Sequence, residues 1–283
     1  DEAGVGSNSA VSALPTFSVF SSVINLTNVS KKDISGAVHW EAKKVIPLPL
    51  EDMILDWKQI ENAPDKGLAP NNIRVLLTGA PRSLVKKYID IFKAAQINLL
   101  SLETETFSLV RSLIGNDRST VMIVEFGAST TDVSIVDNSI PILNRSIDVG
   151  GISITKAIAK SLGIDHEKAE QFKYDLGVGS MAGGEGEMPK AVTDTIAPIV
   201  NEIKYAMNLF QNKNGKKAEK VVLSGGSSLL PHLVDYLAKV LDQKVIIGDP
   251  WARISYPAEL KPLLYEIGPR MSVAIGLALR ELE

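Results

Sequence analysis

The fold of this chain is decided by the segment Val121-Met-Ile-Val-Glu-Phe-Gly-Ala-Ser-Thr-Thr-Asp-Val-Ser-Ile-Val136. Two apolar, β-branched runs flank a turn of small and hydroxyl-bearing residues, which predicts a β-hairpin. Gly127 carries no side chain, so the backbone of the turn can approach a ligand closely. The amide N–H groups of the turn, with the hydroxyls of Ser129, Thr130 and Thr131, suit the oxygens of a phosphate. Such a turn is more often only a turn, so the interpretation depends on the rest of the chain.

A second glycine turn lies further along, in Val221-Val-Leu-Ser-Gly-Gly-Ser-Ser-Leu-Leu-Pro-His-Leu233. The apolar run predicts a buried strand that leads through the turn into a helix. Gly225 and Gly226 remove side chains where a flat ring or a phosphate would lie against the backbone. The start of the helix offers free amide groups to an anion. The plainer interpretation is a helix N-terminus preceded by a tight turn.

Between these two turns lie Arg145-Ser-Ile-Asp-Val-Gly-Gly151 and a helical segment, Lys168-Ala-Glu-Gln-Phe-Lys173. Four elements in this order are far more specific than any one of them. Together they resemble the actin-like ATPase superfamily, and most closely its PilM family of type IV pilus assembly. The other segments similar to that family are Ser18-Val-Phe20, Trp40-Glu-Ala42, Ile46-Pro-Leu-Pro49, Asp249-Pro-Trp251 and Ile275-Gly-Leu-Ala-Leu-Arg280.

The resemblance runs through nearly the whole chain. It implies an α/β fold of the actin-like ATPase (ribonuclease H-like) type with an inserted small α/β subdomain. Residues 1–98 would form mainly this inserted, partner-binding part of the first lobe. Residues 99–118 and 257–283 would complete the first lobe, and residues 119–256 would form the second. Because no segment matches the family's first phosphate hairpin and the chain starts Asp1-Glu-Ala-Gly-Val5, we expect an N-terminal segment to be missing.

Periodicity and turn residues predict the remaining elements. A strand-turn-helix at residues 75–80 is similar to the one at residues 221–226 and suggests a repeated unit. Residues 115–118 are the predicted lobe boundary. The predicted strands are 17–26, 53–60, 73–78 and 140–147; the predicted helices are 34–45, 82–95, 103–114, 153–162, 167–174, 191–211 and 268–282; the predicted loops are 61–72 and the glycine-rich 177–186.

The resemblance further implies an ATP site with Mg²⁺. A carboxylate such as Glu170 would accept hydrogen bonds from ribose hydroxyls. Without the resemblance, Glu170 and Lys173 would more simply form a solvated helix pair. The nucleotide-binding residues that we predict are Gly127, Ala128, Ser129, Thr130 and Thr131 at the β- and γ-phosphates, Glu170 and Lys173 near ribose and adenine, Gly225, Gly226 and Ser227 beside the adenosine, and also Asp132, Gly150 and Gly151.

Two acidic residues are candidates for the chemistry. Glu125 occupies a hairpin position where the family usually has Asp, which orders magnesium-bound waters or the attacking water. Its extra methylene would displace the carboxylate by about 1 Å, enough to slow a reaction about a hundredfold, so nucleotide binding can survive where hydrolysis does not. Asp132 is the second candidate for holding the metal through waters, although it can equally cap the turn.

The composition excludes several classes of function. Net charge is −3 and charged residues make up 22%, so there is no basic surface for nucleic acid and no polybasic anchor. Cysteine is absent and the three histidines are isolated, which excludes disulfides and cysteine metal sites. No apolar run approaches the roughly 20 residues of a membrane span. We therefore expect a cytoplasmic globular protein without direct membrane insertion.

The resemblance also implies partners. We expect the chain to bind the N-terminal cytoplasmic tail of a PilN-like membrane protein, other platform or motor components, and further copies of itself. It would lie at the inner face of the cytoplasmic membrane through its partner. Phe20, Ile24, Trp40 and Trp57 would line the peptide groove, or simply belong to a core. Two other functions remain open: a sugar- or acetate-kinase-like phosphotransferase and an FtsA-like division protein.

Overall fold

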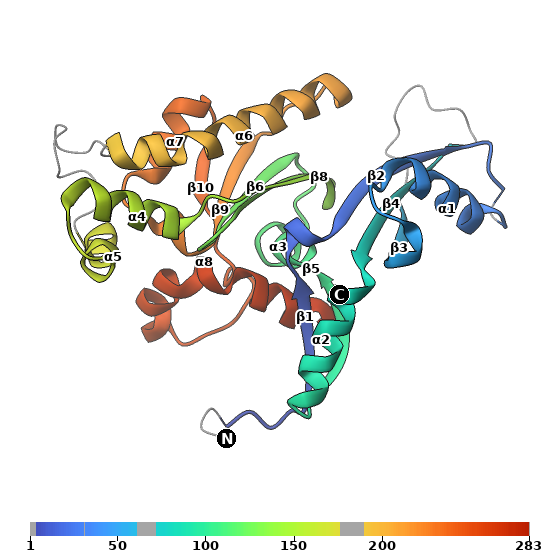
Figure 1. Cartoon of the computed structure of the whole chain (residues 1–283), viewed down its shortest axis with the longest axis horizontal. Coiled ribbons are helices and arrows are strands. Elements are labelled where there is room, and N and C mark those ends of the chain that lie inside the picture. The colour runs from blue at the N-terminus through green and yellow to red at the C-terminus, as the bar shows by residue number, and fades with distance from the viewer. Residues whose placement is uncertain (1–3, 31, 61–71, 176–189, 283) are drawn as a thin grey trace. The chain divides into compact units, whose positions relative to one another are not determined.

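The computed structural model describes residues 4–30, 32–60, 72–175 and 190–282 (Figure 1). The predicted loops 61–72 and 177–186 lie almost entirely outside these ranges. The chain divides into two compact units, residues 1–104 and 105–283. Each unit is described by itself below, and the assignment of segments to actin-like lobes stays a prediction.

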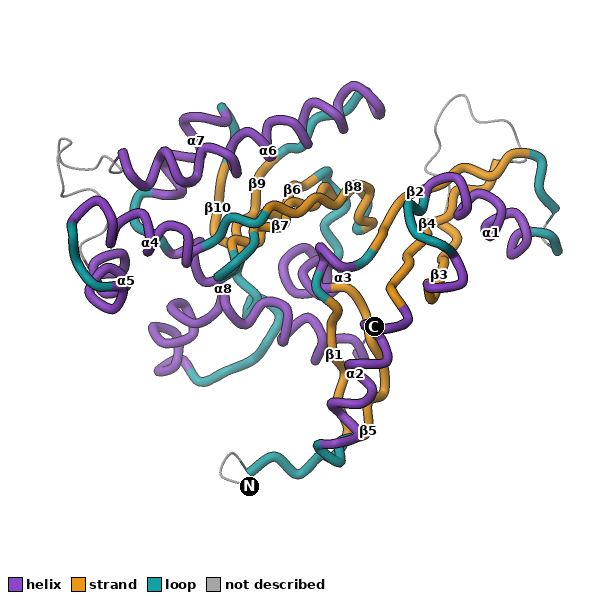
Figure 2. Tube along the Cα trace, in the orientation of Figure 1, coloured by secondary structure: helices purple, strands orange, loops and turns teal. Residues whose placement is uncertain are grey.

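The first unit contains a three-stranded antiparallel sheet in the order β2-β4-β3 (Figure 2). Its strands are β2 (Phe20–Thr27), β3 (Met53–Ile60) and β4 (Asn72–Pro81). Helix α1 (Ile34–Val45) packs its apolar face, including Val38 and Ala42, against Ile24, Val75 and Leu77 of the sheet. The helix ends two residues before Pro47, as predicted, because proline lacks the amide N–H that a further turn would need.

A second part of this unit pairs β1 (Ser9–Leu14) with β5 (Asn98–Thr104) in parallel, beside α2 (Arg82–Ala94). Strand β1 was not predicted. The turn within the strand-turn-helix predicted at residues 75–80 is wrong, because Gly79 lies inside β4 and pairs with Phe20 on one side and Leu55 on the other. The likeness between residues 75–80 and 221–226 therefore ends with the strands.

The second unit is built on a five-stranded mixed sheet in the order β10-β9-β6-β7-β8. Strands β6, β7 and β8 form an antiparallel meander, which confirms the predicted hairpin, while β9 and β10 run parallel to β6. The five strands are β6 (Val121–Phe126), β7 (Thr131–Asp137), β8 (Ile140–Ile147), β9 (Lys220–Ser224) and β10 (Val245–Ile247).

Helices cover both faces of this sheet (Figure 1). Along β6, Met122 and Val124 belong to one core and Val121 and Ile123 to another, because successive side chains of a strand point to opposite faces. The first core contains side chains of α4 (Gly151–Leu162), α5 (His166–Asp175), α6 (Lys190–Asn214) and α7 (Leu233–Leu241). The second contains α3 (Glu105–Leu109), the π-helical segment Val110–Ile114 that continues it, and α8 (Lys261–Ala278).

Three predicted helix boundaries are wrong. The helix predicted from residue 103 starts at Glu105, because the preceding two residues finish β5. The last helix starts at Lys261, because proline, here Pro262, is tolerated in the first turn of a helix. Pro269 lies inside the same helix. After the second glycine turn, a 3₁₀ turn, Gly226–Leu229, precedes α7. The other predicted strands and helices within the described ranges are confirmed, with ends shifted by up to three residues.

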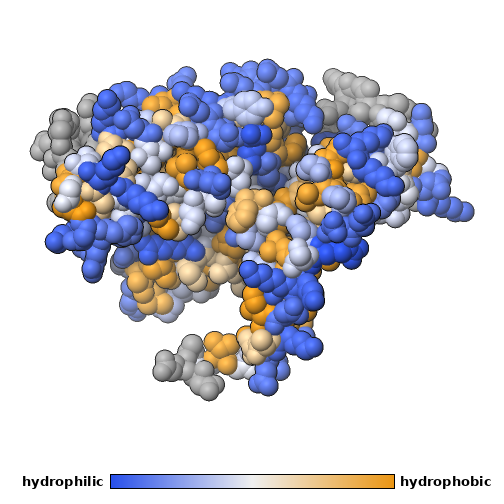
Figure 3. All heavy atoms as spheres, viewed as in Figure 1, coloured by the Kyte–Doolittle hydropathy of each residue, from blue (hydrophilic) through white to orange (hydrophobic). Residues whose placement is uncertain are grey.

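On the face shown in Figure 3, apolar residues lie in scattered groups among hydrophilic ones. Within the described ranges, none of the helices combines the length and the apolar character that a bilayer span requires.

The four side chains predicted to line a groove differ in burial, which gives a stability test. Ile24 is 6% exposed inside the core, whereas Trp40 is 65% exposed on α1. We expect Ile24→Ala to lower the free energy of unfolding by about 2–5 kcal/mol. Trp40→Ala should change it by less than about 0.5 kcal/mol. Urea unfolding followed by circular dichroism measures both, and an equal loss in the two variants would contradict this burial pattern.

Candidate functional site

The hairpin turn between β6 and β7 is joined to the start of α4. Within the turn, the Gly127 N–H donates to the carbonyl of Thr130 over 3.0 Å. From the helix, the N–H groups of Gly151 and Ile152 donate to the carbonyls of Gly127 and Ala128, each over 2.9 Å. The turn is therefore held from both sides, and Ala128 at its tip remains exposed.

The three hydroxyls of the hairpin are not equivalent. Ser129 is exposed and Thr130 is half-buried, as a phosphate contact requires. Thr131 is fully buried, and its Oγ1 donates to the carbonyl of Val149 over 2.7 Å. The Thr131 hydroxyl thus holds the segment before α4 in place. Only the backbone of Thr131 remains for the predicted phosphate contact.

The second glycine turn lies directly against the hairpin. Gly225 has φ +80°, and a Cβ there would lie 2.4 Å from the carbonyl oxygen of Phe126, so no other residue fits without moving the backbone. One residue further on from Gly226, the Ser227 Oγ donates to the carbonyl of Gly127 over 3.3 Å. The structure therefore brings together the two turns that the sequence suggested.

Lys173 and Glu170 form an ion pair beside the start of α4, in which Lys173 is buried and Glu170 is half-buried. Lys173 is 2% exposed, and its Nζ donates to both carboxylate oxygens of Glu170, over 2.9 and 2.8 Å. It also donates to Thr155 Oγ1 over 2.9 Å and to the carbonyl of Gly151 over 3.3 Å. The solvated-pair alternative is therefore wrong for Lys173.

The partners of Glu170 also determine its charge. Thr155 donates a hydrogen bond to Glu170 Oε2. Burial alone would raise the pKa of Glu170, but the hydrogen bonds from Lys173 and Thr155 outweigh it and hold the pKa below its ordinary value. Glu170 is half-buried, so an ionised carboxylate with a fixed position remains partly accessible to a ligand.

Two residues near this pair were missed by the sequence analysis. The Tyr174 ring lies 4.8 Å from Lys173 Nζ and 5.6 Å from the guanidinium carbon of Arg270. The Arg270 side chain also covers Gly226, where a Cβ would lie 3.2 Å from Nε. Tyr174 adjoins Lys173 in sequence, but no local pattern links it to Arg270, because that residue arrives from α8.

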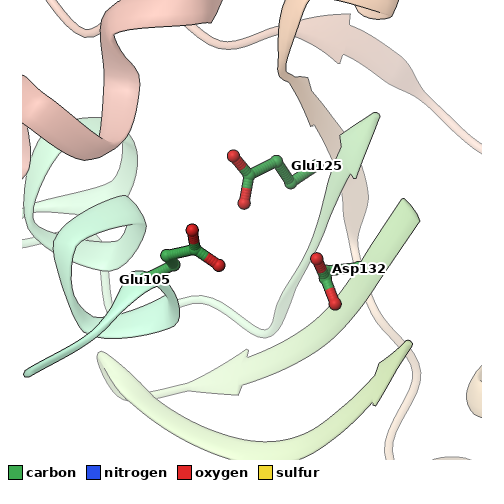
Figure 4. A group of neighbouring side chains, drawn as sticks. All are labelled: Glu105, Glu125 and Asp132. Atoms are coloured by element: carbon green, nitrogen blue, oxygen red, sulfur yellow. The ribbon is translucent and has the colours of Figure 1, made fainter. Parts of the chain in front are cut away.

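Three carboxylates converge at the end of β6 that leads into the hairpin turn (Figure 4). They belong to Glu105 at the start of α3, Glu125 on β6 and Asp132 on β7, and one oxygen of each lies within 4.8 Å of the others. Glu125 and Asp132 are opposite each other in the β6–β7 register, so their side chains share one face of the sheet. The sequence analysis missed Glu105, which only the packing of α3 brings to this place.

Burial disfavours the ionised form of the carboxyl groups in this cluster. Glu125 Oε2 is buried and has no hydrogen-bond partner in the part of the chain that the structure describes. Burial, and then the nearby charges of Glu105 and Asp132, raise the pKa of Glu125 to about 8. Burial also raises the pKa of Asp132, although the hydrogen bond from Ser146 opposes it.

The donor set of the cluster fits a hard divalent cation. Carboxylate oxygens are the protein ligands that Mg²⁺ prefers, either directly or through its waters. A cation would also balance charges that otherwise force a carboxyl group to stay protonated. Within the cluster, Glu125 lies two residues before Gly127. The adjacent parallel strands β6 and β9 both lead into a glycine turn at this end of the sheet. Ligands of open α/β sheets bind at such strand ends.

Comparison with known sequences gives a family and more distant relatives. The family model for the type IV pilus assembly protein PilM matches residues 1–282. The cell division protein FtsA of Neisseria meningitidis serogroup B is 27% identical over 286 residues, which cover 88% of this chain and 66% of that protein. FtsA of Agrobacterium fabrum is 26% identical over 54% of this chain and 38% of that protein. The chain thus spans less than two thirds of the length of these relatives.

Comparison with solved structures confirms the predicted actin-like ATPase fold. A PilM-PilN type IV pilus biogenesis complex superimposes with a TM-score of 0.78 at 24% identity, over 96% of this chain and 79% of that chain. MreB 5 of Spiroplasma citri bound to AMPPNP gives a TM-score of 0.53 at 14% identity, over 72% and 66% of the two chains.

The raised pKa of Glu125 predicts a pH-dependent stability in the absence of divalent cations. A carboxyl group with a raised pKa stabilises the fold below its ordinary value of 4.5, and this contribution is lost as the pH rises through about 8. Glu125→Gln cannot ionise, so it should gain roughly 2 kcal/mol or more over the wild type between pH 5 and pH 8. Urea unfolding across this range measures the difference.

The exposed Glu167→Gln on α5 is the matched control and should show no such gain. A difference between Glu125→Gln and the wild type that stays constant from pH 5 to pH 8 would contradict the assignment of a buried, protonated carboxyl group.

Proposed function

We propose, because this chain belongs to the PilM family of type IV pilus assembly proteins, that it is a nucleotide-binding scaffold of the pilus assembly platform at the inner membrane. The observation that carries the nucleotide part is the meeting of the two glycine turns beside three carboxylates. The turns supply backbone groups for phosphates and a flat ring, and the carboxylates supply ligands for a cation. ATP with Mg²⁺ is a ligand that uses both.

The proposed nucleotide lies along the two turns. The hairpin at residues 127–131 contacts the β- and γ-phosphates, and the turn at residues 225–227 lies beside the adenosine. Glu170 accepts hydrogen bonds from the ribose, while the buried Lys173 holds the Glu170 carboxylate in place rather than contacting the ligand itself. MreB 5 of Spiroplasma citri, which shares the fold, was solved with AMPPNP bound, and this favours an adenine nucleotide.

The three carboxylates would hold Mg²⁺ through its waters. When bound there, the ion would supply positive charge that offsets the charge of the phosphates. Glu125 carries one methylene more than the Asp usual in the family, so we propose that nucleotide binding persists while hydrolysis is weak or absent. Glu105 adds an acidic group to the two that the sequence indicated.

The proposed partner is the cytoplasmic tail of a PilN-like membrane protein. The solved structure with a TM-score of 0.78 is a PilM-PilN complex, which supports a partner of this kind. Other platform or motor components and further copies of the chain are additional proposed partners. Because the partner would supply the membrane attachment, we place the protein in the cytoplasm at the inner face of the membrane.

The first unit offers one surface for such a peptide. Among the described residues, β2 pairs with β4 alone, so its other edge can accept an added strand. Trp40 and Phe17 are 65% and 62% exposed, as residues that contact a partner must be. Ile24 belongs to the core, which corrects its predicted place in the groove. Phe20 and Trp57 pack against the same core and are only half-buried.

A division-protein function is the second candidate, because FtsA of Neisseria meningitidis aligns over 88% of the chain. The match of the PilM family model over residues 1–282 favours pilus assembly. No observation on the described residues favours the phosphotransferase.

Nucleotide binding should depend on Gly127. A Cβ there would lie 3.0 Å from the Thr130 carbonyl, so Gly127→Val widens the turn and fills the space proposed for a phosphate. We expect ATP affinity to fall at least about a hundredfold in calorimetry. Gly6→Val is the matched control, because a Cβ at Gly6 meets nothing within 4 Å. Unchanged affinity in a folded Gly127→Val protein would disprove the phosphate assignment.

The partner surface can be tested with a labelled peptide. The cytoplasmic tail of the pilus membrane protein encoded beside this one should bind, with a rise in fluorescence anisotropy. Trp40→Ala should weaken binding about tenfold, since exposed aromatic residues often dominate such interfaces. Absence of binding at millimolar peptide would reject the scaffold proposal. Full affinity in Trp40→Ala would instead place the receptor surface away from α1.

A further inference from the structure

Helices α3 and α8 cross with their backbones in contact. A Cβ at Gly276 of α8 would lie 2.0 Å from the carbonyl oxygen of Ser108 and 2.5 Å from its carbonyl carbon. Ser108 lies in α3 and is fully buried. Both atoms in the way belong to the main chain, so no side-chain rotation would make room for alanine.

Small residues and one buried arginine hold α3 and α8 together where they cross. Gly268, Ser272 and Gly276 recur at every fourth position of α8 and are all buried, so they form one face of the helix. From the π-helical segment that continues α3, the Arg111 Nη1 donates to the carbonyl of Gly276 over 2.6 Å. The position of α3 relative to α8 is therefore determined at Gly276.

Glu105 lies on the same short helix, three residues before Ser108, at its first position. Its carboxylate is one of the three that converge in Figure 4. A displacement of α3 at Ser108 also displaces Glu105, because the two residues are about one helical turn apart in the same helix. The distance of Glu105 from Glu125 and Asp132 thus depends on how closely α3 approaches α8.

We propose that Gly276 is a positioning residue for the carboxylate cluster: its missing side chain lets α3 lie against α8 and so places Glu105 beside Glu125 and Asp132. This inference rests on the cation site of the proposed function and assigns a role to the segment of residues 275–280. An alanine at position 276 requires the backbones to separate by about 1 Å or more. That displacement is several times the roughly 0.2 Å within which the ligand distances of a metal site are held.

A double-mutant cycle with Mn²⁺ as the probe tests this role. Free Mn²⁺ is titrated by electron paramagnetic resonance in the full chain without nucleotide. Gly276→Ala should weaken Mn²⁺ affinity about tenfold or more, as should Glu105→Gln. In the double variant, Gly276→Ala should add less than about twofold to the effect of Glu105→Gln, because it acts through that carboxylate. A merely structural role would give independent, additive losses.

Gly36→Ala is the matched control, because Gly36 also lies in a helix and a Cβ there meets nothing within 4 Å. It should leave Mn²⁺ affinity unchanged. ATP affinity measured in EDTA should stay within about twofold in Gly276→Ala, since the glycine turns are not displaced.

Wild-type Mn²⁺ affinity in Gly276→Ala, or an equal loss with and without Glu105→Gln, would overturn the positioning role. Failure of the wild-type protein to bind Mn²⁺ would instead reject the cation site itself. If Gly276→Ala does not fold, Arg111→Lys replaces it. This variant keeps the charge but loses the planar donor to the Gly276 carbonyl, and it should weaken Mn²⁺ several-fold only when Glu105 is present.

Discussion

The site depends on main chain packed directly against main chain at three glycines. A Cβ would lie 2.6 Å from the Ala128 carbonyl oxygen at Gly150, 2.4 Å from that of Phe126 at Gly225 and 2.0 Å from that of Ser108 at Gly276. Each contact removes the layer of side chains that normally separates two elements. The hairpin, the start of α4, the second glycine turn and α3 can therefore lie close together.

Two buried ionisable groups, Lys173 and Glu125, lie in this region and differ in the partners that the fold gives them. The Lys173 ammonium has hydrogen-bond acceptors from Glu170, Thr155 and the Gly151 carbonyl, so its burial is compensated within the fold. Glu125 lies next to two further carboxylates, and its Oε2 has no partner among the described residues. A compensated charge needs no ligand, whereas a buried carboxyl group beside two further acids loses its proton more readily when a cation is bound. This contrast separates a structural ion pair from a proposed binding site.

The sequence predicted what is encoded locally. The hairpin followed from two apolar, β-branched runs around a glycine turn, and α1 followed from helical spacing before Pro47. Glu105 was missed because α3 is only five residues long and its role comes from packing. The turn expected at Gly79 failed because pairing on both sides of β4 overrides the local preference of glycine for turns. The predicted start of the last helix at residue 268 was wrong because α8 begins at Lys261 and continues through Pro269.

Helix α8 contacts both the second glycine turn and α3, whereas the resemblance indicated only that the last helix belongs to the first lobe. The carbonyl of Pro269 accepts hydrogen bonds from the Gly225 N–H over 3.0 Å and from Ser224 Oγ over 3.3 Å. Two turns further along the same helix, Gly276 receives α3 and with it Glu105. The turn proposed for adenosine and the helix that carries Glu105 thus both contact α8. Because the hydrogen bonds at Pro269 and the contact at Gly276 lie two helical turns apart, roughly 10 Å, a substitution at one of them should leave the other in place.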